Sequence, residues 1–451
     1  MLEPAYQADV VIVGAGVAGL AAAHRLTSAG ISTAVLEAAP YPGGRMSTEK
    51  IDGFRLDRIG QLLSTSYPEL RRTPALDALA LRSFAPGVLL HSDGRRHRAG
   101  ALTGPAGARR ARGALHAVRA LASAPRGSAV PRARAGAPLG TAVDQARLGA
   151  ALARLASAPV ERLLNRPEAP AARALAERGI PARTIDGFLR PLLAALLYDP
   201  ELTTSSRCAD LALHAFASGR LCVPEGGAEA LPDLLARSLP PGTVHTGVRV
   251  TSIATTAVTT AEHGEIRCRA VLVATDARTA GELLPGLRVP GFHPVTVLHH
   301  TMAEAPETGA SLLLDADRSG PVAHTALISR VDPSRAPAGR ALVTSTVMGT
   351  PPPDVDTAVR MHLARLYGTS TARWETLAVH HTPEAVPAMT APHDLRRPVR
   401  LLAGLYVCGD HRDTSTLQGA LHSAHRATTA ILSDLGAAGS LNRAEPLRTA
   451  A

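Results

Sequence analysis

The chain has 451 residues, which is enough for two or three domains, and 45% of them are hydrophobic, as in globular proteins. No apolar run reaches the ~18 residues of a membrane span, and the N-terminus lacks the pattern of a signal peptide, so we expect an intracellular, cytoplasmic protein. The net charge is +10, but aromatic residues make up only 3%, which argues against a nucleic-acid partner.

A nucleotide-binding unit is predicted at the N-terminus. A β-branched run at residues 9–13 indicates a buried strand, and a GxGxxG turn and an Ala- and Leu-rich helix follow it. The first glycine permits a tight turn, the second lets the backbone approach a pyrophosphate, and the third lets helix and strand pack closely. A second strand, residues 33–36, ends at Glu37, where this pattern places a carboxylate for a ribose hydroxyl. The pattern therefore predicts a Rossmann-like dinucleotide site, and Glu37 disfavours a 2′-phosphate.

The net positive charge lies in one segment, residues 95–134. This segment has ten arginines and no acidic residue, and outside it the remaining 38 basic residues equal the 38 acidic ones. Two interpretations stay open. The segment is either a solvated connection, or a surface for an anionic membrane, an acidic partner or an acidic substrate.

Helical periodicity dominates residues 147–218, and six short β-rich runs follow between residues 246 and 382. A further buried strand comes after Pro398, before a helix through residues 421–432. We expect an α/β (α+β) fold in which a discontinuous Rossmann-like domain carries an inserted substrate domain of mixed β-sheet and helices. The predicted nucleotide-binding domain comprises residues 1–90, 205–290 and 395–451. The predicted substrate domain comprises residues 91–204 and 291–394.

Cysteine and lysine usage restricts the chemistry. The four cysteines are scattered, without a CxxC pair or the spacing of a zinc site, so we interpret them as small core residues and expect no metal site from them. Lys50 is the only lysine in the chain. Any mechanism that needs a lysine outside the N-terminal unit is therefore excluded.

Three later stretches narrow the choice of nucleotide. They are PYPGGRMST at residues 40–48, the region from VPEGGAEALPDLLA to AVLVATD at residues 223–276, and GLYVCGDHRDTSTLQGALHSAHRA at residues 404–427. With the N-terminal turn, this set resembles the FAD-dependent flavin amine oxidase and phytoene desaturase superfamily, with which protoporphyrinogen oxidase and the Rab GDP-dissociation inhibitors share a fold. The resemblance covers nearly the whole chain and is weakest at residues 95–157. It implies that FAD is the cofactor.

The resemblance also implies roles for individual residues. The N-terminal glycines hold the pyrophosphate, Glu37 binds the adenosine ribose, Arg45 lies along the cofactor, Val248 contacts adenine through its backbone, and Asp410 meets the ribityl and phosphate side. The predicted FAD-binding residues are Gly14, Ala15, Gly16, Val17, Ala18, Gly19, Glu37, Ala38, Gly44, Arg45, Gly60, Gln61, Leu62, Val248, Ala274, Gly409, Asp410, Gln418, Gly419 and Ala420.

Two departures from the family pattern are visible. The family usually has Asp, any residue, then Gly after the GGR segment, whereas here the glycine, Gly60, comes three positions after Asp57. The C-terminal helix has Ser423, Ala424 and His425 where Ser-Gly-Arg is common.

The expected reaction is a desaturation or dehydrogenation of an organic, apolar substrate, with hydride transfer to flavin N5. Amine oxidases of this superfamily usually place a lysine near N5 on a substrate-domain strand, and Lys50 lies in the N-terminal unit instead. Amine oxidase and protoporphyrinogen oxidase-like activities remain alternatives. A non-catalytic binding protein on the GDP-dissociation-inhibitor fold is the alternative of another class. Because only one dinucleotide fingerprint is present, we expect dioxygen or a quinone-like compound to reoxidise the flavin.

Adjacent histidine pairs in two predicted strands are the acid–base candidates. The pairs are at residues 299–300 and 380–381, and strand alternation turns one member of each pair to each face of the sheet. A histidine near the substrate could accept or relay a proton near neutral pH. We assign His300 and His381 as catalytic, and a purely structural hydrogen-bonding role for them stays open.

Overall fold

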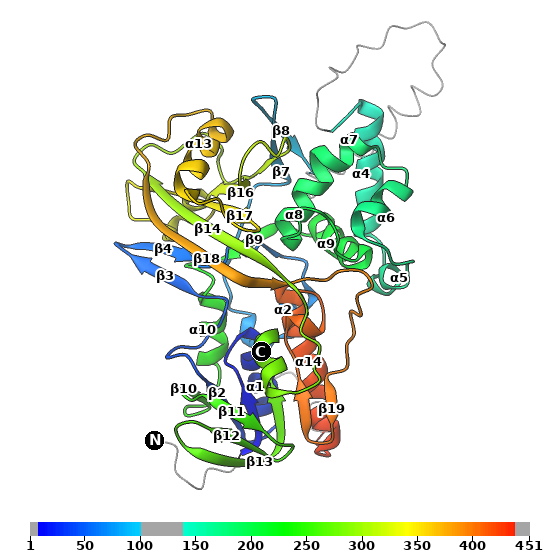
Figure 1. Cartoon of the computed structure of the whole chain (residues 1–451), viewed down its shortest axis with the longest axis vertical. Coiled ribbons are helices and arrows are strands. Elements are labelled where there is room, and N and C mark those ends of the chain that lie inside the picture. The colour runs from blue at the N-terminus through cyan, green and yellow to red at the C-terminus, as the bar shows by residue number, and fades with distance from the viewer. Residues whose placement is uncertain (1–7, 101–138, 438–451) are drawn as a thin grey trace, which may run out of the picture.

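The computed structural model describes residues 8–100 and 139–437, which form a lower lobe around one sheet and an upper lobe of a second sheet flanked by helices (Figure 1). The fold is of the α/β class, with mixed sheets and helices, as predicted. Among the described residues, no helix combines the length and the apolar composition that crossing a bilayer requires.

The lower lobe is built on an eight-stranded sheet. Five strands run parallel in the order β10, β2, β1, β13 and β20, and the other three join by antiparallel pairing. The strands are β1 (Ala8–Val13), β2 (Thr33–Glu37), β10 (Val244–Thr246), β11 (Val250–Ile253), β12 (Ala257–Thr260), β13 (Gly264–Val273), β19 (Arg400–Leu402) and β20 (Leu405–Val407). One domain therefore combines strands from both ends and the middle of the chain, as a discontinuous domain requires.

Alternating side chains of β1 pack into the two hydrophobic layers on either face of this sheet. Val10 and Ile12 pack against helices α1 (Val17–Ser28), α10 (Ala230–Arg237) and α14 (Leu417–Asp434). Val11 and Val13 face the other side and pack against β11, β12 and α11 (Ala277–Leu283). All four valine and isoleucine side chains are buried, and each contributes roughly 1.5–3 kcal/mol of transfer free energy.

The upper lobe contains a seven-stranded sheet in the order β18, β14, β17, β16, β15, β7 and β8. Only the pairing of β15 with β7 is parallel, which makes the sheet mixed. The strands are β7 (Val88–Ser92), β8 (Arg95–Ala99), β14 (Phe292–Met302), β15 (Leu312–Asp315), β16 (Val322–Leu327), β17 (Ala341–Met348) and β18 (Glu375–Pro387). Helix α13 (Val355–Tyr367) packs on one face of this sheet through Val359 and Leu363.

Helices form the right-hand part of the upper lobe in Figure 1. They are α4 (Ala142–Ala156), α5 (Val160–Leu164), α6 (Ala171–Glu177), α7 (Ala182–Thr184), η2 (Ile185–Leu189), α8 (Arg190–Leu197) and α9 (Ser206–Ser218). Thr141 and Asp144 cap α4 reciprocally, and Pro159 separates α4 from α5. Helix α9 packs against α4 in the same core, so this helical region continues past the predicted boundary at residue 204.

Several short elements lie outside the two large sheets and the main helices. They are β3 (Thr48–Ile51), β4 (Phe54–Asp57), β5 (Leu63–Ser64), α2 (Pro68–Arg72), η1 (Pro74–Leu76), β6 (Leu81–Ser83), β9 (Leu221–Pro224), α12 (Ile328–Val331), η3 (Pro333–Arg335) and η4 (Asp410–Arg412). The run at residues 325–331, predicted as one strand, leaves the sheet at Leu327 and turns into α12, where the Ser329 hydroxyl accepts a hydrogen bond from Leu342 N. The four cysteines are free thiols, and three of them are buried.

Candidate functional site

The glycine turn after β1 is shaped by close backbone contacts. Gly14 has φ +104°, a conformation that favours glycine, and a Cβ there would lie 3.0 Å from the Ala274 oxygen. A Cβ on Gly19 would lie 2.0 Å from the Gly14 oxygen. A Cβ on Gly16, in contrast, would meet no atom within 4 Å. The N-terminus of α1 therefore opens onto space next to Gly16, where backbone N–H groups can meet an anionic group.

Glu37 ends β2 beside this turn. Its Oε2 accepts a hydrogen bond from Ala15 N at 2.7 Å, and its Oε1 accepts one from Ala39 N at 2.9 Å. These bonds fix the carboxylate in the wall of a cavity, and each oxygen keeps a lone pair for a ribose hydroxyl.

A second helix N-terminus meets the same cavity. Gly409, which follows β20, has φ +135°, and its N–H donates to Ser423 Oγ at 2.9 Å. Thr416 caps α14 by accepting from Gly419 N at 3.2 Å, and a Cβ on Gly419 would lie 1.9 Å from the Thr414 oxygen. The C-terminal motif thus presents the first turn of α14 to the cavity.

Arg45 joins three distant parts of the chain at the cavity wall. Its guanidinium donates to Asp410 Oδ1 at 2.6 Å and to the Ala385 oxygen on β18 at 3.0 Å. Although desolvation opposes the shift, the negative charges of Asp410 and Asp276 raise the pKa of Arg45. Arg45 is therefore a permanent positive charge between the two lobes.

The cavity has a volume of about 440 Å³ and extends from Glu37 to the start of α14. Most of the predicted cofactor residues line it. They are Gly14, Gly16, Val17, Ala18, Glu37, Ala38, Gly44, Arg45, Gln61, Val248, Gly409, Asp410 and Ala420.

Other predicted cofactor residues support the walls instead of lining them. The N–H of Ala15 holds Glu37, Ala274 packs against Gly14 and Gly19, and Gly419 packs against Thr414. Leu62 is buried in the hydrophobic core of the upper lobe. Gln418 lies beside a second cavity, and its Oε1 accepts a hydrogen bond from Glu69 N at 3.0 Å.

The segment after Asp57, where the glycine is displaced from the family pattern, also contributes to the wall. Asp57 accepts hydrogen bonds from Ala228 N at 2.8 Å, Thr48 Oγ at 2.7 Å and the buried Arg335 at 2.7 Å. Despite burial, the Arg335 guanidinium holds the pKa of Asp57 below its usual value. Ile59 and Gln61 line the cavity, whereas Gly60 between them does not, and its carbonyl accepts from the Tyr198 hydroxyl at 3.0 Å.

Sequence reasoning missed cavity residues from several places. Thr275 and Asp276 follow β13 directly, next to the glycine turn, and the rule that ligands bind at the carboxyl ends of parallel strands could have found them. Residues 384–386 at the end of β18 and residues 415–417 around the start of α14 also line the cavity. Residues 384–386 belong to the other lobe and carry no local sequence signal.

The two histidines predicted to be catalytic lie away from this cavity. His300 is fully buried, with Nε2 3.0 Å from Asp356 Oδ1 on α13. His381 is exposed, and its Nδ1 lies 2.8 Å from Thr296 Oγ. We therefore assign neither of them a proton-transfer role.

The neighbouring histidines lie on the opposite face of the strands, as alternation requires. The rings of His299 and His380 are 5.7 Å apart, and His299 is 3.0 Å from the Asp57 oxygen. Burial lowers the pKa of His299 to about 4. Neither ring lines the cofactor cavity or the second cavity, and His299 is a neutral, hydrogen-bonded core group.

A second cavity of about 260 Å³ lies between the start of α14 and the helices of the upper lobe, and both cavities touch Thr416. Its wall is mostly apolar and includes Leu164, Leu197, Leu211, Phe216, Leu221 and Met389. Glu69 in its wall pairs with Arg72 at 3.1 Å, and Asp413 pairs with His422 at 2.8 Å. Glu161 and Arg396 also line this cavity and form no ion pair with a described residue.

The site combines two helix N-termini, a carboxylate placed for a ribose, and a cavity lined by residues from both the N-terminal and the C-terminal parts of the chain. These features define a dinucleotide-dependent, two-domain oxidoreductase. The space beside Gly16 accommodates a pyrophosphate, and the start of α14 lines the far end of the same cavity. The model of the family described as flavin containing amine oxidoreductase matches residues 17–432, and the chain belongs to this family. FAD is its cofactor.

Curated relatives match the chain in part. Putrescine oxidase of Kocuria rosea is 42% identical over 100 residues, which are 21% of this chain and 20% of that protein. Phytoene dehydrogenase of Streptomyces griseus is 36% identical over 104 residues, or 19% of this chain and 20% of the relative. The chain thus aligns with only about a fifth of the length of each.

Solved structures match nearly the whole fold. An oxidoreductase from Methanosarcina mazei superposes with a TM-score of 0.68 at 16% identity, covering 93% of this chain and 99% of that one. Putrescine oxidase bound to putrescine gives a TM-score of 0.64 at 20% identity, covering 95% and 100%. At these identities, the likeness establishes the fold.

Proposed function

We propose that the chain dehydrogenates or desaturates an apolar organic substrate that binds in the second cavity. Bound FAD supplies a two-electron acceptor that takes the electrons as hydride. The observation that carries the proposal is the mostly apolar wall of this cavity, which touches the cofactor cavity at Thr416. Apolar walls exclude water and bind an uncharged hydrocarbon face without leaving polar groups unpaired.

The position of Lys50 supports this reaction over an amine oxidation that uses a lysine beside the flavin. Lys50 lies on β3, its side chain is 61% exposed, and its ammonium group is 2.8 Å from Glu229 Oε1. It lines neither cavity.

His422 is the side chain we propose as the proton acceptor. It lines the second cavity from α14, and its Nδ1 is 2.8 Å from Asp413 Oδ2. If Nδ1–H donates to Asp413, then Nε2 is left as the basic atom, and the carboxylate stabilises the protonated ring. For reoxidation of the flavin, the single nucleotide fingerprint supports dioxygen or a quinone-like acceptor.

Amine oxidation is the second candidate. The 42% identity with putrescine oxidase over 100 residues favours it. The pairing of buried Glu69 with Arg72 weighs against it, because that carboxylate carries no free charge for a substrate ammonium group. Glu161, which lines the same cavity and forms no ion pair with a described residue, is the carboxylate that favours it.

Anaerobic mixing of the FAD-loaded protein with candidate substrates separates the two reactions. We expect partly saturated polyenes or tetrapyrroles to abolish the visible flavin absorbance, and diamines such as putrescine to leave it unchanged. Bleaching by diamines alone would overturn the proposal.

Two variants test the roles of His422 and of the second cavity. His422→Asn should slow the bleaching at least tenfold with FAD content unchanged. Ala212→Phe, which fills the second cavity, should abolish it.

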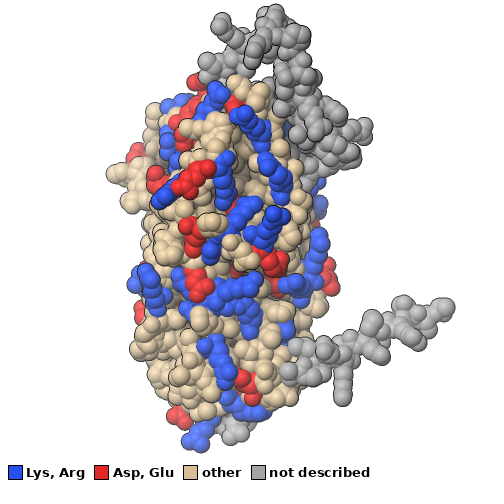
Figure 2. All heavy atoms as spheres, turned by 90° about the vertical axis from the view of Figure 1, so that its right-hand side faces the viewer, with Lys and Arg blue, Asp and Glu red and all other residues tan. Residues whose placement is uncertain are grey.

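We also propose that the arginine-rich segment associates with anionic membranes. Arg95, Arg96 and Arg98 lie on β8 and are exposed, and none forms an ion pair with a described residue. The other seven arginines lie outside the described residues. In the face shown in Figure 2, basic side chains are scattered among acidic and uncharged ones, in keeping with the charge balance outside the segment.

Vesicle co-sedimentation tests this association. Each arginine near an anionic surface contributes about 1 kcal/mol, and salt screens the attraction. We expect the parent protein to sediment with anionic vesicles at low salt, and less at high salt. A variant with Gln at Arg109, Arg110 and Arg112 should sediment less at low salt. A parent that stays in the supernatant, or an equally bound variant, would show that the segment is only a solvated connection.

A further inference from the structure

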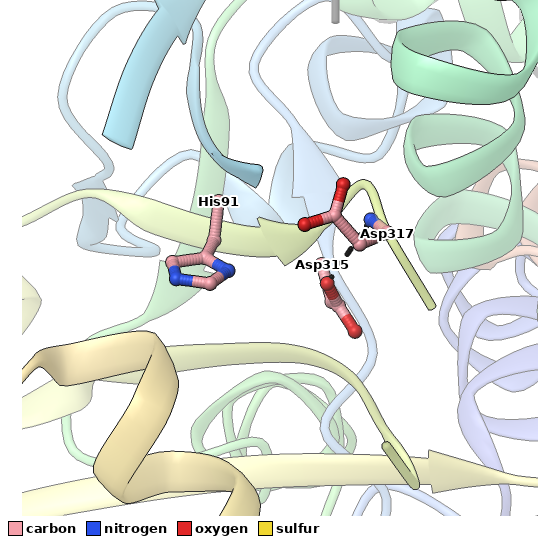
Figure 3. A group of neighbouring side chains, drawn as sticks. All are labelled: His91, Asp315 and Asp317. Atoms are coloured by element: carbon pink, nitrogen blue, oxygen red, sulfur yellow. Dashed lines mark hydrogen bonds between the residues drawn. The ribbon is translucent and has the colours of Figure 1, made fainter. Parts of the chain in front are cut away.

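A group of one histidine and two aspartates lies in the upper sheet, among residues that line neither cavity. His91 is on β7, Asp315 ends β15, and Asp317 is in the turn that follows (Figure 3). Strands β7 and β15 are parallel, and His91 pairs with Asp315 in their register. Paired residues of neighbouring strands point to the same face, so the register itself brings the imidazole and the carboxylate together.

The spacing of the three side chains suits a metal ion. One possible ligand atom from each residue lies within 4.8 Å of the others. Ligand atoms at tetrahedral or octahedral angles around a cation with bonds of about 2.1 Å lie roughly 3.0–3.4 Å apart. Binding an ion therefore requires side-chain rotations that bring the three ligand atoms closer together than 4.8 Å.

His91 provides an independent indication of a ligand. The residue is only 6% exposed, and its buried Nδ1 has no hydrogen-bond partner among the described residues. Figure 3 shows a ring nitrogen of His91 turned towards the two carboxylates. Leaving a buried nitrogen unpaired costs roughly 1–3 kcal/mol, and a bound cation removes this cost.

The hydrogen bonds around Asp315 leave one oxygen available. Its Oδ2 is occupied, because it accepts from Ser319 N at 2.6 Å and lies 3.1 Å from His362 Nε2. The Val322 N–H donates to His362 Nδ1, so Nε2 carries the proton and donates to Asp315. The Oδ1 atom accepts only from Asp317 N, at 3.1 Å, and keeps a lone pair.

Asp317 is held in place in the same way. Ser92 Oγ donates to its Oδ1 at 2.7 Å, and Asp93 N donates to its Oδ2 at 2.8 Å. Each oxygen keeps a lone pair, and no Lys or Arg of the described chain forms an ion pair with either aspartate. Two carboxylates that form no ion pair with Lys or Arg, beside a buried imidazole nitrogen without a hydrogen-bond partner, form a site that suits a positive ion.

We propose that His91 Nδ1, Asp315 Oδ1 and one oxygen of Asp317 bind a divalent first-row transition cation such as Zn²⁺ or Mn²⁺. A mixed nitrogen and oxygen ligand set suits these ions, whereas Ca²⁺ prefers oxygen ligands alone. Asp317 is exposed, so water completes the coordination. The ion ties the β7–β8 hairpin to the turn between β15 and β16, which makes its role structural.

The test uses the FAD-loaded, chelator-treated full chain. We expect isothermal titration with Zn²⁺ or Mn²⁺ to show one site per chain, and each ion to raise the thermal midpoint. Asp317→Asn removes the charge and keeps the side-chain shape, and it should weaken binding at least tenfold with the flavin spectrum unchanged. Asp394→Asn is the matched control, because Asp394 is an exposed aspartate that likewise accepts a backbone hydrogen bond. It should bind like the parent.

Three results would overturn the proposal. They are the absence of a stoichiometric site in the parent, equal binding by the parent and Asp317→Asn, and binding of Ca²⁺ in preference to both transition ions. The last result would remove the imidazole from the ligand set.

Discussion

Gly16 and Gly19 are three residues apart, but Gly19 is required for backbone packing whereas Gly16 leaves space for the ligand. A Cβ on Gly19 would lie 2.0 Å from a backbone oxygen, so we expect Gly19→Ala to destabilise the fold by about 1–3 kcal/mol. A Cβ on Gly16 meets nothing, so Gly16→Ala should fold normally but bind FAD more weakly, because the methyl group occupies the ligand space. Thermal midpoints of the apoproteins and FAD dissociation constants distinguish these outcomes. Equal destabilisation of both variants would contradict the assignment.

Glu37 is expected to hold the adenosine ribose. Glu37→Ala loses charge-assisted hydrogen bonds worth about 1.5–3 kcal/mol, so FAD affinity should fall roughly ten- to a hundredfold. Glu37→Gln keeps one acceptor for the backbone N–H groups of residues 15 and 39 and separates the loss of charge from the loss of wall structure. Quenching of flavin fluorescence on reconstitution measures the affinity, and an unchanged dissociation constant in both variants would refute the role.

His299 makes stability depend on pH. Its pKa is lowered to about 4 by burial, whereas an unfolded histidine titrates near 6.5. Between these values the unfolded chain binds a proton that the folded chain does not, so the folded state loses stability as pH falls through this range. His299→Gln should give a shallower fall of the thermal midpoint between about pH 7 and pH 5. The exposed His263→Gln is the control and should follow the parent, and identical slopes in all three proteins would contradict the prediction.

At the scale of elements, Arg335 connects η3 to β4. It is 1% exposed and pairs with Asp57 at 2.7 Å and with Asp332 at 3.1 Å. Arg335→Met leaves two carboxylates buried without a counter-charge, which should cost about 3–5 kcal/mol of unfolding free energy. Arg330→Met on the exposed side of α12 should cost little. Denaturant midpoints test the difference, and a similar small change in both would contradict it.

Local sequence predicts elements better than it predicts contacts between them. The glycine turn, Glu37 and the C-terminal motif were found because each is encoded by spacing within a few residues. Ala385, which bonds Arg45 from 340 residues away, has no such signal. Alternation correctly predicted that each histidine pair divides between two faces, but it could not say which member faces the cofactor lobe. That depends on packing, and His299 faces Asp57 while His300 faces α13.

For the whole molecule, the cavity predicts how FAD is held. Among the described residues, no cysteine or histidine lines the cofactor cavity, so none is placed to form a covalent bond to the flavin. Acid precipitation should release all of the yellow colour into the supernatant. The same treatment after proteolysis is the control for trapped cofactor, and colour that stays attached to a peptide would contradict non-covalent binding.

The sequence predicted a discontinuous cofactor domain because strand-like runs recur at both ends of the chain. It could not give the strand order. In the sheet, β13 lies between β1 and β20, and β2 lies between β1 and β10, so neighbours in space are far apart in sequence. The strand order depends on which hydrophobic faces pack together. Pairing between strands that are far apart in the sequence is not encoded by any local residue pattern.

The parallel sheet also has a consequence for synthesis on the ribosome. Strand β1 emerges first, but β20 and α14, which complete its sheet and cover α1, emerge only after residue 404. Until then β13 presents an open edge to other nascent chains, and the cavity lacks Gly409 and Asp410. The growing chain therefore lacks a complete FAD site during most of its translation. A chain that stops before β20 leaves the edge of β13 unpaired, which makes it prone to aggregation or degradation.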